Sequence, residues 1–420
     1  MSAGDYSTPA TANIWTDRAM LETWRDIEIA VLEAQQRHGI VTKVQLSAAK
    51  DAKISLVLWR EETEEVGHEL VAFLRTWGAP IAHIGLTSSD ITDTGLALRL
   101  AQTNNVLVER ALRVEAALAD MAEDDHLRLG RTHGQPAAPM AWSQVVANWQ
   151  AALRRWHVRF QEVREQVEVA KISGPVGSYL HVSREIEREV ADALGLNPVA
   201  VATQIVMRDS LAAWAAECGT LASIVEAIAG ELRLMAHHQI GEGSERGGSS
   251  SSAMPHKVNP NRLERLSGLA RVVRSAYEPI ACGVAQWHER DMAHSSVERM
   301  LVPQTACTLD YMLDSLAEIL TSYELDTVRI GENYRDNALE AHMHSVQTAI
   351  QRAGHGHAYA QEATREIYDR VRPLKAAGSG PTIQRLHDDP LFNALTGKSA
   401  AHPFGTYVFP IPHTEHLEEE

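Results

Sequence analysis

The sequence has few of the residues that would suggest a secreted, metal-binding or nucleic-acid-binding protein. Its 420 residues include only three cysteines, Cys218, Cys282 and Cys307, which lie far apart and match neither a disulfide nor a metal-ligand spacing. Lysine and arginine total 39 and aspartate and glutamate total 55, which gives a formal net charge of −16. An acidic chain of this kind is a poor candidate for binding nucleic acid or an anionic membrane.

Targeting signals, long apolar runs and nucleotide loops are also missing. The first residues, MSAGDYSTPATAN, contain neither the basic nor the apolar stretch of a signal peptide, and no uncharged apolar run is long enough to span a membrane. The glycines at 241–248 lack the Gly-Lys-Ser/Thr ending of a phosphate loop. Pairs such as His237–His238 step by one position, whereas zinc ligands on a helix lie three or four apart. We therefore expect a cytoplasmic protein with no metal and no cofactor.

What the sequence does contain is a set of long helices with apolar seams. Steps of three and four residues place the members of each seam on one helix face. The seams are Leu107, Ala111, Val114, Leu118 and Met121; Trp142, Trp149, Leu153, Trp156, Phe160, Val163 and Val167; and Leu211, Trp214, Cys218, Leu221, Val225, Ile228, Leu232 and Met235. Seams of this length suit a bundle of nearly aligned helices and favour association between subunits. The sequence predicts an all-α fold.

Four polar segments, three of which contain glycine, interrupt these helices, and chemistry is expected there. They are residues 83–90, 130–136, 247–260 and 287–296. The third reads GGSSSSAMPHKVNP, in which a mobile serine run is followed by a single lysine. Lys257 could hold the Ser251 hydroxyl as an alkoxide, or bind an anionic substrate beside it. The alternative is a flexible Ser/Gly linker, which would not require the Met-Pro-His-Lys-Val-Asn-Pro that follows.

Together the segments resemble the fumarase/aspartase superfamily and, within it, the adenylosuccinate lyases. The matching motifs are GLTSSD at 85–90, GRTHGQP at 130–136, KISGPVGSY at 171–179, Gln204 with Arg208-Asp209, SSAMPHKVNP at 251–260 and WHERDMAHSSVER at 287–299. The resemblance implies a homotetramer with a central bundle, active sites shared among three chains, and release of fumarate from a substituted succinate. It also implies an N-terminal helical domain over 1–95, a bundle domain over 96–335 that holds the catalytic motifs, and a small C-terminal domain over 336–420.

The resemblance assigns roles to individual residues. Elimination β to a carboxylate needs a strong base, stabilisation of the carboxylate in its doubly charged form, and an acid for the leaving nitrogen. Ser251 matches the base, with Lys257 beside it; His133 matches the general acid, Glu264 the carboxylate that orients it, and His68 a second histidine near the substrate. Substrate contacts are expected from Tyr6, Thr87, Ser88, Thr132, Gln204, Asn259, Arg265, Arg290, Ser295 and Arg299.

Departures from the adenylosuccinate lyase pattern leave the substrate open. Asp5 and Gly67 stand where that family usually has arginines, and Val258 gives the Lys-Val-Asn-Pro form of fumarases and aspartases. Adenylosuccinate is the leading substrate, which would place the chain in purine biosynthesis, including the SAICAR step. The alternative is a specialised relative that cleaves an unphosphorylated substituted succinate, such as nitrosuccinate or a hydrazinosuccinate. A crystallin-like structural role is disfavoured, since packing requires neither Ser251 nor Lys257.

Overall fold

The computed structural model describes residues 6–123, 125–246, 249–250, 254, 257–376, 385–386 and 388–397, with side chains except at 249–250 and 373–376. Within these residues the chain is helical, with short two-stranded pairings, so the predicted all-α fold is confirmed. The chain divides into two compact units. Unit 1 comprises Met1–Glu115, Ala151–Gly230 and Arg262–Glu318, and unit 2 comprises Ala116–Gln150, Glu231–Asn261 and Ile319–Glu420. The division into 1–95, 96–335 and 336–420 stays a prediction.

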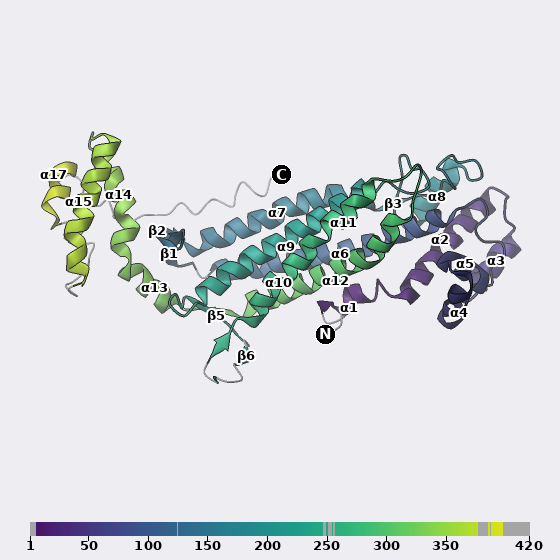
Figure 1. Cartoon of the computed structure of the whole chain (residues 1–420), viewed down its shortest axis with the longest axis horizontal. Helices are drawn as coiled ribbons and strands as arrows, with labels where there is room; N and C mark the ends of the chain where they lie inside the picture. The colour runs from purple at the N-terminus through teal and green to yellow at the C-terminus, as the bar shows by residue number, and fades with distance from the viewer. Residues whose placement is uncertain are drawn as a thin grey trace. The chain divides into compact units, whose positions relative to one another are not determined.

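Long helices form the centre of the fold, and Figure 1 shows them running side by side. They are α6 (Ser88–Glu123), α7 (Trp142–Val167), α9 (Asp209–Met235), α10 (Asn261–Ser275) and α12 (Ala293–Ser322). Every residue of the three predicted seams is buried. The indole nitrogen of Trp214 in α9 donates to the Asn104 side chain in α6 at 2.9 Å, and that of Trp156 in α7 donates to the Glu217 carbonyl in α9 at 3.1 Å. These two buried indoles thus pack between helices while their N–H groups are hydrogen-bonded.

Shorter helices of unit 1 precede and connect the long ones. They are α1 (Pro9–Ala12), α2 (Asp17–Arg37), α3 (Lys43–Asp51), α4 (Leu56–Val66), α5 (Glu69–Thr76), α8 (Arg184–Leu194), α11 (Tyr277–Ala281) and the 3-10 turn η2 (Cys282–Val284). Side chains of Thr16, Thr42, Ser55 and Ser183 cap α2, α3, α4 and α8 by accepting from backbone N–H groups in the first turn. A core that includes Trp24, Phe73 and Trp77 holds the N-terminal helices together.

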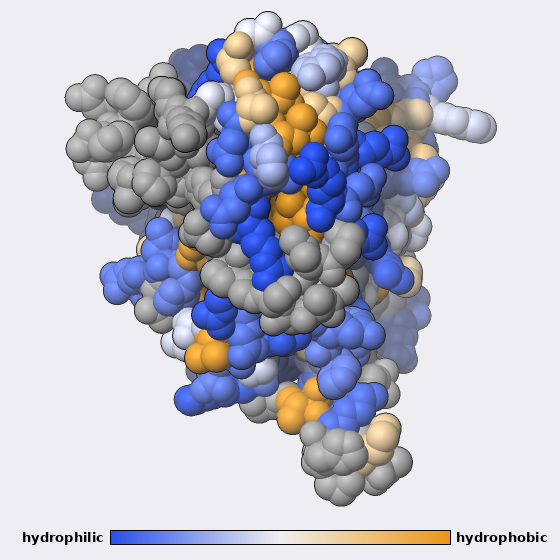
Figure 2. All heavy atoms as spheres, turned by 90° about the vertical axis from the view of Figure 1, so that its left-hand side faces the viewer, coloured by the Kyte–Doolittle hydropathy of each residue, from blue (hydrophilic) through white to orange (hydrophobic). Residues whose placement is uncertain are grey.

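Unit 2 ends in a small group of helices with its own core. These are α13 (Thr327–Asp336), α14 (Ala338–Arg352), α15 (His357–Ala376) and α17 (Pro390–Thr396). Leu339, Val346, Ile350, Ile367 and Phe392 are among the buried residues that join α14, α15 and α17. Figure 2 colours the residues by hydropathy and shows a strip of hydrophobic residues bordered by hydrophilic ones.

The strands are short. They pair as β1 (Leu127–Thr132) with β2 (Gln135–Ala141), β3 (Val169–Ala170) with β4 (Asn197–Pro198), β5 (Gly243–Glu245) with β8 (Tyr323–Leu325), and β6 (Ser249–Ser250) with β7 (Val258–Asn259). Among the described residues one helix, α9, is long and apolar enough to cross a membrane by length and composition alone. Its seam, from Leu211 to Met235, is buried within the protein, as in the core helix of a helical bundle.

Candidate active site

A cavity of about 740 Å³ lies within unit 1. Five residues with predicted roles line it, and they come from three separate stretches of the sequence: His68, Ser88, Arg290, Ser295 and Arg299. The same wall contains aromatic and charged groups that the sequence analysis did not single out, including Trp15, Trp24, Asp93, Arg99, His294 and Glu298. Long-range folding therefore gathers polar motifs around one cavity of the size of a ligand site.

The N-terminus of α6 borders this cavity, and two motifs fix it. The buried Asp90 carboxylate accepts from the Thr87 backbone N–H at 2.7 Å and from the Lys171 ammonium at 2.6 Å. It also accepts from the backbone N–H groups of Ser173 and Gly174, at 3.0 and 3.2 Å. GLTSSD and KISGPVGSY thus form one hydrogen-bonded unit. It positions Thr87 and Ser88 where the helix dipole favours an anion.

A buried charge cluster forms another part of the wall. The Arg208 guanidinium donates to both oxygens of Asp93, at 2.8 and 2.9 Å, and its Nε donates to Glu298 at 2.7 Å. Burial alone would raise the pKa of Asp93, but Arg208 outweighs it and holds that pKa below its usual range. Burial raises the pKa of Glu298, which Arg208 only partly opposes. Arg208 is therefore committed to protein carboxylates.

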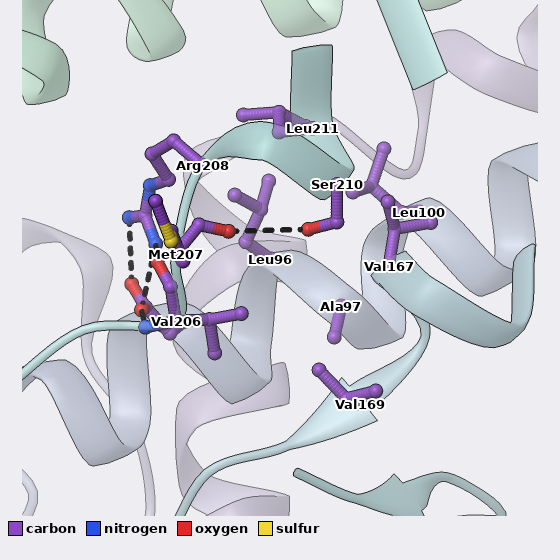
Figure 3. A pocket seen from close by; sticks show the side chains of 11 residues that line it. Leu96, Ala97, Leu100, Val167, Val169, Val206, Met207, Arg208, Ser210 and Leu211 are labelled. Carbon is purple, nitrogen blue, oxygen red and sulfur yellow. Dashed lines mark hydrogen bonds and ion pairs between the residues drawn. The ribbon is translucent and has the colours of Figure 1, made fainter. Parts of the chain in front are cut away.

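Behind the Asp93–Arg208 pair lies a small, mainly apolar cavity of about 30 Å³, shown in Figure 3. Its lining comes from α6, the end of α7, the start of α9 and the loop before it, with Leu96, Ala97, Val167, Val206 and Leu211 among the side chains. Its volume is enough for about one water molecule. The larger cavity is therefore the candidate substrate site.

The loop that carries Arg290 is held by its own side chains. Asp291 accepts from the backbone N–H groups of Trp287 and Ala293, at 3.1 and 2.7 Å, and so ties the loop to the start of α12. Arg290 donates to the half-buried Gln204 side chain at 3.5 Å, which brings two predicted contact residues together. Among the described residues no carboxylate lies within 4 Å of the Arg290 guanidinium, so it remains available to an anion.

His68 and Arg299 reach the cavity from the N-terminal parts of two helices, α5 and α12. His68 is the N-cap residue of α5: its Nδ1 accepts from the Val71 backbone N–H at 3.4 Å, which leaves the proton on Nε2. Glu69, next in the chain, accepts from both terminal nitrogens of Arg299 at 2.5 and 2.7 Å. Arg299, predicted to bind substrate, therefore already has a bidentate carboxylate partner.

His294 and Arg99 are basic residues of the wall that the sequence analysis did not assign to the site. Burial, with Arg208 next in importance, lowers the pKa of His294 to about 4, so this imidazole is neutral near pH 7. Burial, with Arg299 next in importance, lowers the pKa of Arg99 to about 10. His294 lies inside the WHERDMAHSSVER motif, which could have indicated it. For Arg99 the sequence contained only one indication, a single cation within the otherwise apolar run Leu96–Leu100.

Tyr6 and Arg265 lie together elsewhere in unit 1. Both contact Tyr311: the Tyr6 ring stands edge-on at a centroid distance of 5.4 Å, and the Arg265 guanidinium donates to the Tyr311 hydroxyl at 2.7 Å. Tyr311 follows Ser295 by 16 residues in α12, which is about 24 Å along the helix axis. Within one chain these two residues therefore lie well away from Ser295. The exposed Glu264 precedes Arg265 in the first turn of α10.

The remaining predicted residues belong to unit 2. His133 and Gly134 form the two-residue turn between β1 and β2, with φ of 55° and 74°, as a type I′ turn requires. The turn presents His133 and Thr132 as exposed side chains. The sequence analysis described residues 130–136 only as a helix-interrupting segment, and their strand pairing is a correction. Lys257 is exposed and Asn259 half-buried, while Ser251 lies outside the described residues.

Comparisons with known proteins show the family of the chain. A family model described as lyase matches residues 8–275, more than half of the chain. An adenylosuccinate lyase from Thermotoga maritima is 35% identical over 340 residues, which cover 78% of this chain and 79% of the relative. An adenylosuccinate lyase from Staphylococcus saprophyticus is 35% identical over 334 residues, which cover 76% and 78%.

Two solved structures share the fold. A fumarate lyase from Mesorhizobium sp. BNC1 superposes with a TM-score of 0.83 at 21% identity, covering 94% of this chain and 93% of that one. A 3-carboxy-cis,cis-muconate lactonizing enzyme from Pseudomonas putida gives 0.82 at 23% identity, covering 93% and 91%. At these identities the similarity establishes the fold alone. With the family match and the 35% identical relatives, the chain belongs to the lyase family of the fumarase/aspartase superfamily and resembles the adenylosuccinate lyases within it.

Proposed function

We propose that this lyase acts on adenylosuccinate, which it splits into AMP and fumarate. The coarser activity, breaking a carbon–nitrogen bond with release of fumarate, is the one that the family and the adenylosuccinate lyase relatives support. The proposal concerns the substrate, the residues and the assembly. One observation supports it most: a large cavity that gathers His68, Ser88, Arg290, Ser295 and Arg299.

The charges of the cavity suit an anionic substrate. Of its four arginines, Arg208 and Arg299 are bound by carboxylates, whereas Arg290 has none within 4 Å among the described residues. Ser88 adds a hydroxyl and the positive end of the α6 dipole. Adenylosuccinate has two carboxylates and a phosphate, so it offers partners for groups at separate points of this wall.

In the proposed reaction Ser251 removes a proton from the methylene carbon next to the carbon that bears the nitrogen, and Lys257 stabilises the serine alkoxide. Thr87, Ser88 and Asn259 donate hydrogen bonds to the substrate carboxylates as charge develops on them. His133, oriented by Glu264, gives a proton to the departing nitrogen, and the carbon–nitrogen bond breaks to leave fumarate. The backbone of the type I′ turn suits this role, since it holds an exposed imidazole at the tip of a fixed hairpin.

We further propose that each site is shared among three chains of a homotetramer. Support comes from the separation of the predicted residues within one chain. The described lining of the cavity does not include Tyr6 or Arg265, which belong to the same unit. Tyr6 and Arg265 lie beside Tyr311, about 24 Å from Ser295 along α12. Residues that serve one reaction must lie within a few ångströms of one substrate, so neighbouring chains would have to supply the missing groups.

One further observation favours an unphosphorylated substrate as the second candidate. Glu69 holds Arg299 bidentately, and Gly67 offers no side chain to the cavity, so this end of the wall is less cationic than its arginines suggest. A small substituted succinate, such as nitrosuccinate or a hydrazinosuccinate, would need fewer cations than a nucleotide.

Fumarate release distinguishes the two substrates. Purified protein is incubated with adenylosuccinate and separately with nitrosuccinate and hydrazinosuccinate, and fumarate is followed in the ultraviolet. A kcat/KM of about 10⁴ M⁻¹s⁻¹ or more on adenylosuccinate is the expected result. A value orders of magnitude lower, with rapid release from a small substrate, would contradict the proposal and favour the second candidate.

A further inference from the structure

Arg99 is a cation of the cavity wall that neither the motifs nor the proposed chemistry uses. It lies on α6, where the cavity-lining residues Ser88, Thr92, Leu96 and Arg99 follow in steps of four, four and three. These steps keep them on one face of the helix. From Ser88 to Arg99 is 11 residues, or about 16 Å of helix. The cavity therefore follows α6 from its N-terminus to Arg99.

Aromatic packing fixes the position of this guanidinium. Its Cζ atom lies 4.8 Å from the centroid of the Trp15 ring, within the range of a cation–π contact. Its Nε donates to the Gly95 carbonyl at 3.4 Å, and Trp24 packs so closely on Gly95 that a Cβ there would lie 3.1 Å from the indole Cδ1. Trp15 and Trp24 both line the cavity. The stacked ring leaves the edge of the guanidinium to make hydrogen bonds.

The local charge is not balanced by protein. Among the described residues no carboxylate lies within 4 Å of Arg99, and its Nε–Gly95 bond is the hydrogen bond it makes there. After burial, the charged groups that act on the pKa of Arg99 are Arg299, which is paired, and Glu69, the partner in that pair. Arg99, Arg299 and Glu69 thus sum to one positive charge at this part of the wall, which an anionic group of a ligand would neutralise.

We propose that Arg99 is a specificity-determining residue that binds the phosphate monoester of the substrate. The inference rests on the proposed function, because the carboxylates are assigned there to Thr87 and Ser88 at the other end of the α6 stripe. A substrate that extends along the helix from those residues would bring its opposite end, the phosphate, to Arg99. A planar guanidinium can donate two parallel hydrogen bonds to a phosphate, which a lysine cannot.

Equilibrium binding of AMP and of adenosine, measured by calorimetry, tests the inference without turnover. The variants are Arg99→Gln and Arg99→Lys, with Arg18→Gln as the matched control, since Arg18 is an exposed arginine paired with Glu22 on α2. We expect wild-type protein to bind AMP more tightly than adenosine, and Arg99→Gln to weaken AMP binding about ten- to hundredfold, the size of a charge-assisted hydrogen bond. Adenosine binding should stay within about twofold, Arg99→Lys should recover part of the loss, and Arg18→Gln should match wild type.

Other outcomes separate the inference from the proposed function. Equal weakening of AMP and adenosine would mean that Arg99 supports the cavity without contacting phosphate, and would overturn the inference. So would an Arg99→Gln variant that binds AMP like wild type, whether or not the protein releases fumarate from adenylosuccinate. If AMP binding depends on Arg99 but adenylosuccinate is not turned over, the proposed reaction fails while the phosphate site stands. A melting temperature near that of wild type shows that Arg99→Gln is folded.

Discussion

The charged residues of the cavity fall into two kinds, those satisfied by the protein and those left for a ligand. Arg208 is held between Asp93 and Glu298, and Arg299 is held by Glu69. A guanidinium with two carboxylate partners stabilises the wall. Breaking these ion pairs to bind substrate would cost a large amount of free energy. Arg290, whose one side-chain hydrogen bond among the described residues is that to Gln204 at 3.5 Å, is of the second kind. Motif membership does not separate these roles, since Arg208 and Arg290 both lie in family motifs.

His294 should make stability depend on pH. Its side chain is 4% exposed, and its pKa of about 4 lies below the ordinary histidine value of 6.5. Between these values the unfolded chain binds more protons than the folded one, so this contribution is complete above about pH 6.5 and is lost as pH falls toward 4. As the pH falls from 7 to 4, the free energy of unfolding should decrease by up to about 3 kcal/mol more for wild-type protein than for His294→Gln.

Urea unfolding at fixed protein concentration and several pH values measures this difference. His344→Gln, on the exposed side of α14, serves as the control and should follow wild type. An His294→Gln variant whose stability falls with acid as steeply as that of wild type would show that His294 does not titrate in this range.

The role of Ser251 as the base can be tested by comparing its substitution with that of a neighbouring serine. Ser251→Ala should lower kcat by about two to four orders of magnitude with the fold retained, because a positioned proton acceptor is lost. Ser250→Ala should change kcat far less. Fumarate release and circular dichroism check both points. A near wild-type rate for Ser251→Ala beside an inactive Ser250→Ala would move the base by one position.

At the scale of elements, hydrogen bonds between two motifs, GLTSSD and KISGPVGSY, fix the start of α6. The Lys171 ammonium and the Asp90 carboxylate are both fully buried, and Asp90 also accepts from the backbone of residues 173–174. Gly177 is required in the same segment: its φ is 73°, and a Cβ would lie 2.0 Å from the Ala202 carbonyl oxygen. These contacts hold the loop against the helix terminus, which sets the direction of Thr87 and Ser88.

Removing the Asp90 charge should therefore destabilise the protein strongly. Asp90→Asn leaves the Lys171 ammonium buried without a counter-charge, and we expect a loss of about 3–5 kcal/mol in unfolding free energy. Glu22→Gln breaks the exposed Arg18–Glu22 pair and should cost less than about 1 kcal/mol. Chemical denaturation of the two variants gives the comparison. A loss for Asp90→Asn no larger than for Glu22→Gln would mean that Lys171 finds another partner or gives up its proton.

On the scale of the whole molecule, the long helices still expose apolar side chains. Leu112, Val158, Leu234 and Met300 are between 53% and 70% exposed on α6, α7, α9 and α12. Scattered exposed apolar residues are ordinary, but here three of them lie on α6, α7 and α9, the helices with buried seams. They are suited to packing against further copies of the chain, which agrees with the proposal that sites are shared.

Mixed oligomers test that sharing directly. Ser251→Ala and His133→Ala are each expected to be nearly inactive. If one site draws these residues from different chains, the two variants unfolded and refolded together should regain part of the wild-type activity, because some sites then contain both intact residues. Native mass spectrometry confirms that mixed oligomers form. No recovery in such oligomers would mean that Ser251 and His133 serve a site from the same chain.

The sequence by itself determined the helices and the family. The spacing of apolar residues in a seam is a local property of the sequence, so α6, α7 and α9 and their buried faces could be predicted. The long motifs identified the superfamily. The hairpin turn at His133–Gly134 was not predicted from the sequence. It depends on two positive φ angles and is not marked by alternating apolar and polar side chains. Tertiary structure alone decided which charges pair. Arg99 and Glu69 are 30 positions apart, and Glu69 and Arg299 are 230 apart. Only the packing of α5, α6 and α12 brings them to one wall, since electrostatic interaction depends on distance in space and not on order in the chain.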